Sequence, residues 1–97
     1  MAIKFVSSEV IMVEKRIMFE MDGKNFIGNL TKKHDNPWNL VFIDESGFRF
    51  SQLPDLRRLI YSKNIIEPDD DIVILFRYNT FFVNKEGIFD LPQRSFT

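Results

Sequence analysis

The chain has 97 residues and a formal net charge of −1, so it lacks the excess of basic residues by which most proteins hold duplex nucleic acid. It contains no cysteine, which excludes disulfide frameworks and metal sites built from thiolates. Its eleven phenylalanines, two tyrosines and one tryptophan can fill a large apolar core. No linker-like segment divides the sequence, and we therefore expect a single compact domain over residues 1–97.

No apolar run approaches the roughly 20 residues that a membrane-spanning helix needs. The N-terminal segment also lacks the apolar centre of a secretory signal, because Glu9 interrupts its short apolar stretches. We therefore expect a cytoplasmic protein that does not contact a membrane.

The first half of the chain alternates apolar and polar residues with the period of two that is typical of β-strands. The Asp-Gly pair at 22–23 is a strong signal for a hairpin, because both central positions of a type I′ turn need positive φ. Counting outward from this turn places Phe19 opposite Phe26, and Ile17 opposite Gly28. The missing side chain at Gly28 predicts that a neighbouring segment approaches closely there.

Two later segments combine Asp or Asn with a Gly three positions further on, which is typical of longer hairpin loops. The first would place Ile43 opposite Phe48, and the second would place Val83 opposite Ile88. Near the N-terminus, residues 10–21 would form one long, bent strand if the chain folds as an OB-like barrel.

Residues 52–63 show the spacing of an amphipathic helix. Ser51 is a candidate N-cap, Pro54 suits a first turn, and Asn64 can adopt the left-handed conformation that ends a helix. The apolar face of this helix is formed by Leu53, Leu56, Leu59 and Ile60.

Three consecutive aspartates, residues 69–71, follow Pro68 and precede the apolar run IVILF. Contiguous carboxylates point in different directions, and a metal site would need further oxygen ligands from distant segments. We therefore interpret 67–71 as a solvated turn that leads into a central strand, and we expect no metal. Beyond this strand, the four aromatic residues of 76–82 cannot all be buried unless Asn79 and Thr80 break the strand. The alternative is that Phe81 and Phe82 are both core residues of a sheet covered on two sides.

The order of these elements predicts an α+β fold with a mostly antiparallel sheet. A strand meander comes first, one helix follows at about 52–63, and a β-hairpin ends the chain. The same order of elements occurs in a small OB-like barrel, although no motif residue supports that match. The alternative is an open curved sheet packed on one helix.

No pattern of catalytic residues appears in the sequence. The single histidine, His34, lies in a loop beside Asp35, but a general base also needs an oriented partner and a substrate pocket. Of the four glycines, three lie in expected turns and one in a strand, so none remains for a phosphate-binding loop. We expect neither catalysis nor a cofactor.

Six side chains are candidates for a binding surface. Trp38 follows a proline turn, where its ring can either anchor an interface or close the end of the core. Arg57 and Tyr61 are one helical turn apart and share a face, although an arginine there also suits the helix dipole. The full set is Trp38, Arg57, Arg58, Tyr61, Lys32 and Lys33.

Three functions remain open at this point. The first is a small non-catalytic protein-binding module, such as an adaptor, a regulator or a virus-encoded inhibitor. The second is an OB-like domain that binds single-stranded nucleic acid through these basic and aromatic residues. The third is an enzyme with an unrecognised site. Another protein is the expected partner, and apolar edge strands would also allow a homodimer.

Overall fold

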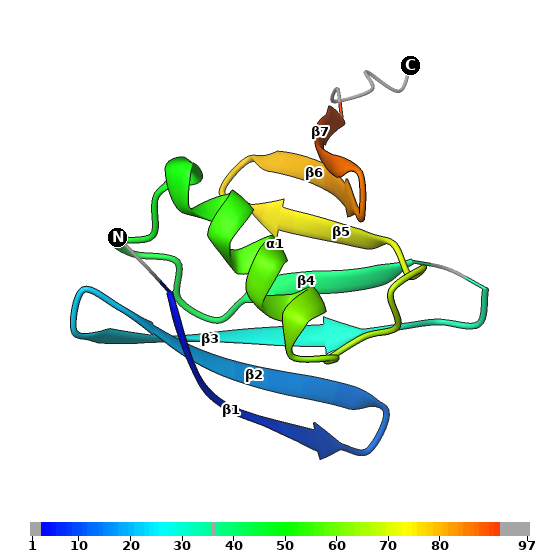
Figure 1. Cartoon of the computed structure of the whole chain (residues 1–97), viewed down its shortest axis with the longest axis horizontal. Helices are drawn as coiled ribbons and strands as arrows, with labels where there is room; N and C mark the ends of the chain where they lie inside the picture. Colours follow the sequence, from blue (N-terminus) through cyan, green and yellow to red (C-terminus); the bar gives the residue numbers. More distant parts are fainter. Residues whose placement is uncertain (1–2, 36, 92–97) are drawn as a thin grey trace.

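The structure is a computed structural model that describes residues 3–35 and 37–91. Seven strands form one sheet in the order of the sequence, and a helical segment lies between the fourth and the fifth (Figure 1). The elements are β1 (Lys4–Ile11), β2 (Glu14–Met21), β3 (Lys24–Thr31), β4 (Trp38–Phe42), the 3-10 turn η1 (Phe50–Gln52), α1 (Leu53–Ser62), β5 (Ile72–Phe76), β6 (Asn79–Asn84) and β7 (Gly87–Leu91).

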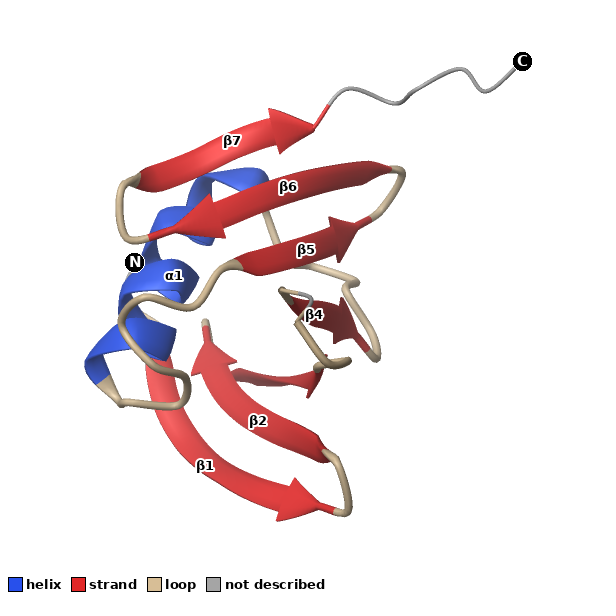
Figure 2. Ribbon diagram, turned by 90° about the vertical axis from the view of Figure 1, so that its right-hand side faces the viewer, coloured by secondary structure: helices blue, strands red, loops and turns tan. Residues whose placement is uncertain are grey.

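All neighbouring strands are antiparallel except β4 and β5, which are parallel. Parallel neighbours cannot be joined by a tight turn, so the chain crosses over between them, and α1 lies in this crossover. The sheet is curved, and α1 packs on its concave face (Figure 2). The predicted α+β class and the mostly antiparallel sheet are therefore confirmed.

The sheet is open rather than closed. Its two edge strands, β1 and β7, stand at opposite ends of the strand order, whereas a barrel requires the first and last strands to pair. The barrel prediction is therefore wrong, and the alternative, an open curved sheet packed on one helix, is confirmed. The hairpin expected after the helix is extended by one strand into the meander β5 to β7.

The core lies between α1 and the concave face of the sheet. Its centre is a cluster of phenylalanine rings whose contacting centroids lie 4.9–6.1 Å apart, several of them edge to face. Such contacts stabilise the fold beyond the burial of apolar area alone. The rings belong to Phe19, Phe26, Phe42, Phe48 and Phe76, all of them buried.

The β2–β3 hairpin has the register predicted from its Asp-Gly turn. Phe19 pairs with Phe26 and Ile17 pairs with Gly28. A Cβ atom at Gly28 would lie 2.7 Å from Cδ1 of Leu40, so the predicted close approach is also confirmed. Glycine at this position lets the Leu40 side chain of β4 pack directly over the hairpin.

The helix α1 begins and ends within one residue of its predicted bounds, and its predicted apolar face is buried. The N-cap prediction at Ser51 is wrong, because Ser51 lies inside η1 and the cap position of α1 is Gln52, which makes no capping side-chain bond. The 3-10 turn removes the need for one, since the Leu53 N–H already donates to the Phe50 carbonyl.

The C-terminus of α1 ends as predicted. Asn64 has φ 55°, in the left-handed region. The Ile65 N–H donates to the Ile60 carbonyl, and the Asn64 N–H donates to the Tyr61 carbonyl. This is a Schellman motif, which satisfies the last carbonyls of the helix and turns the chain back toward the sheet.

Two strand predictions in the first half of the chain are wrong. Residues 10–21 form parts of two strands, because a turn at Met12 and Val13 separates β1 from β2. Phe48 does not pair with Ile43. Its ring is fully buried in the core, so the chain leaves the sheet after β4 instead of turning back along it.

The last three strands follow the predicted pattern with one shift. The break expected at Asn79 and Thr80 is a hairpin turn two residues earlier, and residue 77 there has φ 57°. Val83 pairs with Ile88 as predicted. Because β6 is continuous, its side chains alternate, and Phe81 packs against the core while the next residue faces the other side of the sheet.

Candidate functional site

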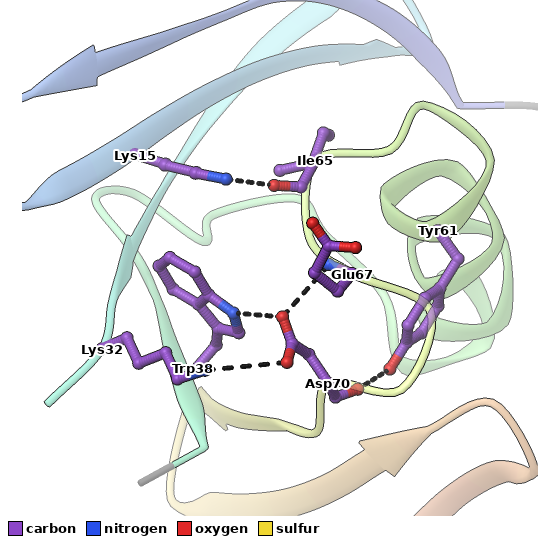
Figure 3. A network of polar contacts seen from close by, with 7 residues as sticks. All are labelled: Lys15, Lys32, Trp38, Tyr61, Ile65, Glu67 and Asp70. Atoms are coloured by element: carbon purple, nitrogen blue, oxygen red, sulfur yellow. Dashed lines mark hydrogen bonds and ion pairs between the residues drawn. The ribbon is translucent and has the colours of Figure 1, made fainter. Parts of the chain in front are cut away.

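The turn that follows α1 is held by one carboxylate, that of Asp70 (Figure 3). Its Oδ2 accepts hydrogen bonds from the Trp38 indole N–H at 3.0 Å and from the Glu67 backbone N–H at 3.1 Å. Lys32 Nζ lies 3.6 Å from Oδ1, and the Tyr61 hydroxyl donates to the Asp70 carbonyl at 2.7 Å. Three of the six candidate residues therefore meet at Asp70.

These contacts act as a structural anchor and not as an acid-base site. Burial raises the pKa of Asp70, but the Trp38 and Glu67 hydrogen bonds and the Lys32 charge outweigh it, so the pKa lies below its ordinary 3.8. Burial, with Asp71 nearby, raises the pKa of Tyr61 above its ordinary 10.0. Neither group changes its protonation near neutral pH, as a general acid or base would.

Trp38 occupies the start of β4, where its half-buried ring packs against the edge of the core. Its backbone N–H donates to the Asp71 carbonyl at 2.9 Å. The Nζ atoms of Lys15 and Lys32 lie 5.1 and 5.7 Å from the ring centroid, within the range of a cation–π contact. The indole thus closes one end of the core, and its polar atom is bonded within the chain.

The remaining helical candidates line an open cleft of about 380 Å³ on the outer side of α1. Arg57 donates from Nε to the Asn84 carbonyl at 2.7 Å and from Nη2 to the Lys85 carbonyl, so it ties the β6–β7 turn to the helix. Arg58 pairs with Asp55 at 2.9 Å. The cleft is lined by Arg57, Arg58, Tyr61, Ser62, Pro68 and Lys85.

Lys33 is exposed and belongs to neither group of contacts. The neighbouring His34 lies 3.0 Å from the Asp35 carboxylate, and both side chains are nearly fully exposed. Asp69 is exposed in its turn and pairs with Lys85 at 3.0 Å. Among the described residues, no group of three or more His, Asp or Glu side chains is arranged to hold a metal ion.

A larger surface lies on the convex side of the sheet, which α1 leaves uncovered. We call it the helix-free face and define it by the outward-pointing residues of β3 to β7. They are Asn25, Ile27, Asn29, Thr31, Asn39, Val41, Val73, Leu75, Thr80, Phe82, Asn84, Gly87, Phe89 and Leu91, and Ile43 continues the row of β4. None of these residues carries a charge.

The helix-free face also exposes large apolar side chains. The exposed fractions are 44% for Val41, 48% for Leu75 and 48% for Phe89. The strand register places Val41 beside Leu75, and Val73 beside Phe82, which in turn pairs with Phe89. These side chains therefore form a continuous apolar surface and not scattered single exposures.

The sequence contains the signal for this surface, because strands β4, β5 and β7 carry apolar residues at both odd and even positions. Such a pattern is typical of strands covered on both faces, but here α1 covers only one face. The β1–β2 turn also exposes apolar side chains, since Met12 is 92% exposed and Val13 is 82% exposed.

Comparison of the chain with family models, with curated proteins and with solved structures finds no match. The argument for function therefore depends on the surfaces of this molecule alone. Within residues 3–35 and 37–91, no helix is both long and apolar enough to cross a bilayer.

Proposed function

We propose that this chain is a non-catalytic protein-binding module whose partner covers the helix-free face. The observation that carries the proposal is the lack of charge at the outward positions of five adjacent strands, β3 to β7, in a chain where 28% of residues are charged. Outward positions of an antiparallel sheet are ordinarily polar, and an extended apolar surface is typical of an interface. Interface centres are likewise poor in charge and rich in aromatic residues.

The chemistry of the face indicates the chemistry of the partner. A charged group placed against Val41, Leu75 or Phe89 would lose its water without gaining an opposite charge. The matching surface is therefore apolar, with amide or hydroxyl groups that bond to the asparagines and threonines of the face. Binding of this kind depends little on ionic strength.

The alternative of single-stranded nucleic-acid binding finds less support. Phosphates need accessible cations, and the helix-free face offers none. Of the predicted basic contacts, Lys32 is paired with Asp70, and Arg57 is bonded to two carbonyl groups. A partner-binding role for Trp38, Tyr61 and the four basic candidates stays a prediction, as does the cytoplasmic location.

The test places a charge at the centre of the face with Leu75→Asp. Because Leu75 is about half exposed in the free chain, the variant should fold, with a cooperative melt close to that of the wild type. Proteins captured from extracts of the cells that produce the chain should be lost with Leu75→Asp. They should remain with Val13→Asp, which adds the same charge at the exposed β1–β2 turn.

Two outcomes contradict the proposal. Equal capture by Leu75→Asp and the wild type would show that the helix-free face is not the binding surface. Tight binding of labelled single-stranded oligonucleotides that weakens steeply with salt would instead favour the nucleic-acid function, since counterion release dominates such binding. Fluorescence anisotropy across a salt series measures this directly.

A further inference from the structure

The edge strand β1 offers unpaired backbone groups over its whole length. It pairs with β2 on one side alone, and seven of its eight residues are exposed. Such an edge is a template for another strand where shortness, charged residues, prolines or bulges do not protect it. β1 has one lysine and no proline, and a single bulge at Val6 is its one irregularity.

An open cleft of about 520 Å³ runs between the first half of β1 and the helix α1. Its apolar lining comes from Ile3, Phe5 and Leu59, and its lining also includes the basic residues Arg58 and Lys63. A strand added along β1 would therefore lie beside the helix and would place alternate side chains in this cleft, which is a recurrent mode of strand addition.

We propose that a second copy of this chain adds to β1 in antiparallel orientation about a two-fold axis, so that β1 of each copy pairs with β1 of the other. The register has Val6 opposite Ser7 of the second copy. It follows that Phe5 lies opposite Ser8, and Lys4 lies opposite Glu9. Because the contact is two-fold symmetric, each of these pairs occurs twice.

The directions in which the β1 side chains point agree with this register. Phe5 and Ser8 pair within their own chain with Phe19 and Ile17, which point into the core, so both face the α1 side. Lys4 and Glu9 pair within their own chain with Glu20 and Arg16 and both face the opposite side. Residues opposite one another across the two-fold axis therefore lie on the same side of the combined sheet, as direct strand neighbours must.

Charge selects this register over its neighbours. A shift by two residues in either direction would place Lys4 opposite Ile11 or Ser7, and neither charge would meet its opposite. The proposed register pairs each lysine with a carboxylate across the interface. Opposite charges that face one another across a sheet are stabilising, and like charges are destabilising.

The same register also covers an apolar side chain that the single chain leaves in water. Val10 is 72% exposed and faces the α1 side, because it pairs within its chain with Lys15, two positions from Ile17 and so on the same face of the sheet. In the dimer Val10 lies opposite Ile3 of the second copy. There it enters the cleft that Ile3, Phe5 and Leu59 line.

The test is sedimentation equilibrium of the chain from micromolar to near-millimolar concentration. The wild type should change from the 11.5 kDa mass of one chain toward twice that mass. Lys4→Glu creates two Glu–Glu contacts and Glu9→Lys creates two Lys–Lys contacts, so each variant alone should dimerise at least about tenfold more weakly. An equimolar mixture should recover the dimer, because every cross-strand charge pair is then opposite in sign.

The mixture separates the proposed interface from effects within one chain. Glu9 also pairs with Arg16 at 4.0 Å, so Glu9→Lys can change the stability of the hairpin, but mixing cannot repair a misfolded chain. Val10→Asp should abolish the dimer, whereas Val13→Asp, which lies in the β1–β2 turn beyond the end of β1, should leave it intact.

A wild type that stays at the mass of one chain at every concentration would overturn the proposal. So would a mixture that dimerises no better than the two separate variants. The inference does not depend on the proposed binding function, because Leu75→Asp alters the helix-free face and should dimerise like the wild type. Failure of one proposal therefore leaves the other untouched.

Discussion

At the scale of single residues, Asp70 holds its turn to two other elements, to β4 through its side-chain carboxylate and to α1 through its backbone carbonyl. Trp38 comes from the start of β4 and lies 32 positions away, whereas Tyr61 comes from the last turn of α1. The pKa of Asp70 is lower in the folded chain than its ordinary 3.8, so the folded state favours the charged form. Its stabilising effect is present above that value and is lost as the pH falls through the folded pKa.

Asp70→Asn should lower the free energy of unfolding by about 1–2 kcal/mol at neutral pH, because it replaces charge-assisted hydrogen bonds with neutral ones. The difference from the wild type should shrink as the pH falls below 3.8, where the native carboxyl also becomes neutral. Urea unfolding at several pH values measures both effects.

Asp69→Asn is the matched control, since it removes the neighbouring charge from an exposed surface pair and should leave stability unchanged at every pH. A pH-independent difference between Asp70→Asn and the wild type would contradict the role assigned to the carboxylate.

Sequence alone could not decide between the two roles offered for Trp38. A tryptophan at a strand start can anchor an interface or close a core, and the choice depends on what its N–H meets. The acceptor is the middle one of three aspartates whose local pattern indicates a solvated turn. That turn is present, but pairing of β4 with β5 brings one of its carboxylates within hydrogen-bond distance of the indole N–H.

At the scale of elements, the turn that ends α1 contains Asn64, whose positive φ would destabilise the fold if most other residue types stood there. A residue other than Gly, Asn or Asp pays for positive φ through contact of its Cβ with the backbone. Asn64→Val should therefore lower the free energy of unfolding by about 1–2 kcal/mol. Asn64→Gly should leave it unchanged or raise it slightly, because glycine adopts this conformation freely.

Thermal unfolding followed by circular dichroism compares these two variants. Asn64 is exposed, so loss of buried contacts cannot explain a difference between them. Equal destabilisation by valine and glycine would mean that the asparagine side chain, and not the backbone conformation, holds the helix end.

Turns whose residue types favour positive φ could be predicted from the sequence, and turns that lack such residues could not. The Asp-Gly turn gave the register of β2 and β3 residue by residue. Met12 and Arg77 also have positive φ in hairpin turns, although neither residue type favours it. In both places the pairing of the flanking strands imposes the turn, and the residue types of the turn do not indicate that pairing.

At the scale of the whole molecule, the sequence gives the class of fold but not whether the sheet closes. The order of strands and helix is compatible with a barrel and with an open sheet. Closure depends on whether β1 and β7 meet, and α1 occupies the concave side that they would have to enclose (Figure 2). The helix-free face and the free edge of β1, which support the two proposals, both follow from the open sheet.

The parallel pairing of β4 with β5 has a consequence for the kinetics of folding. It is the junction between two meanders, β1 to β4 and β5 to β7, each built from hairpins that close locally within microseconds. Joining the meanders requires residues 43–71 to be closed into a loop, which costs chain entropy before any contact repays it. The junction should therefore limit the rate of folding.

Ile74→Val removes one methyl group from β5 beside Leu40 of β4 and should slow folding in stopped-flow measurements. Ile88→Val makes the same change at the outer strand β7 and should mainly speed unfolding. If each variant changed the folding rate and the unfolding rate equally, the junction would not be the rate-limiting step, and the two meanders would form and join in a single step.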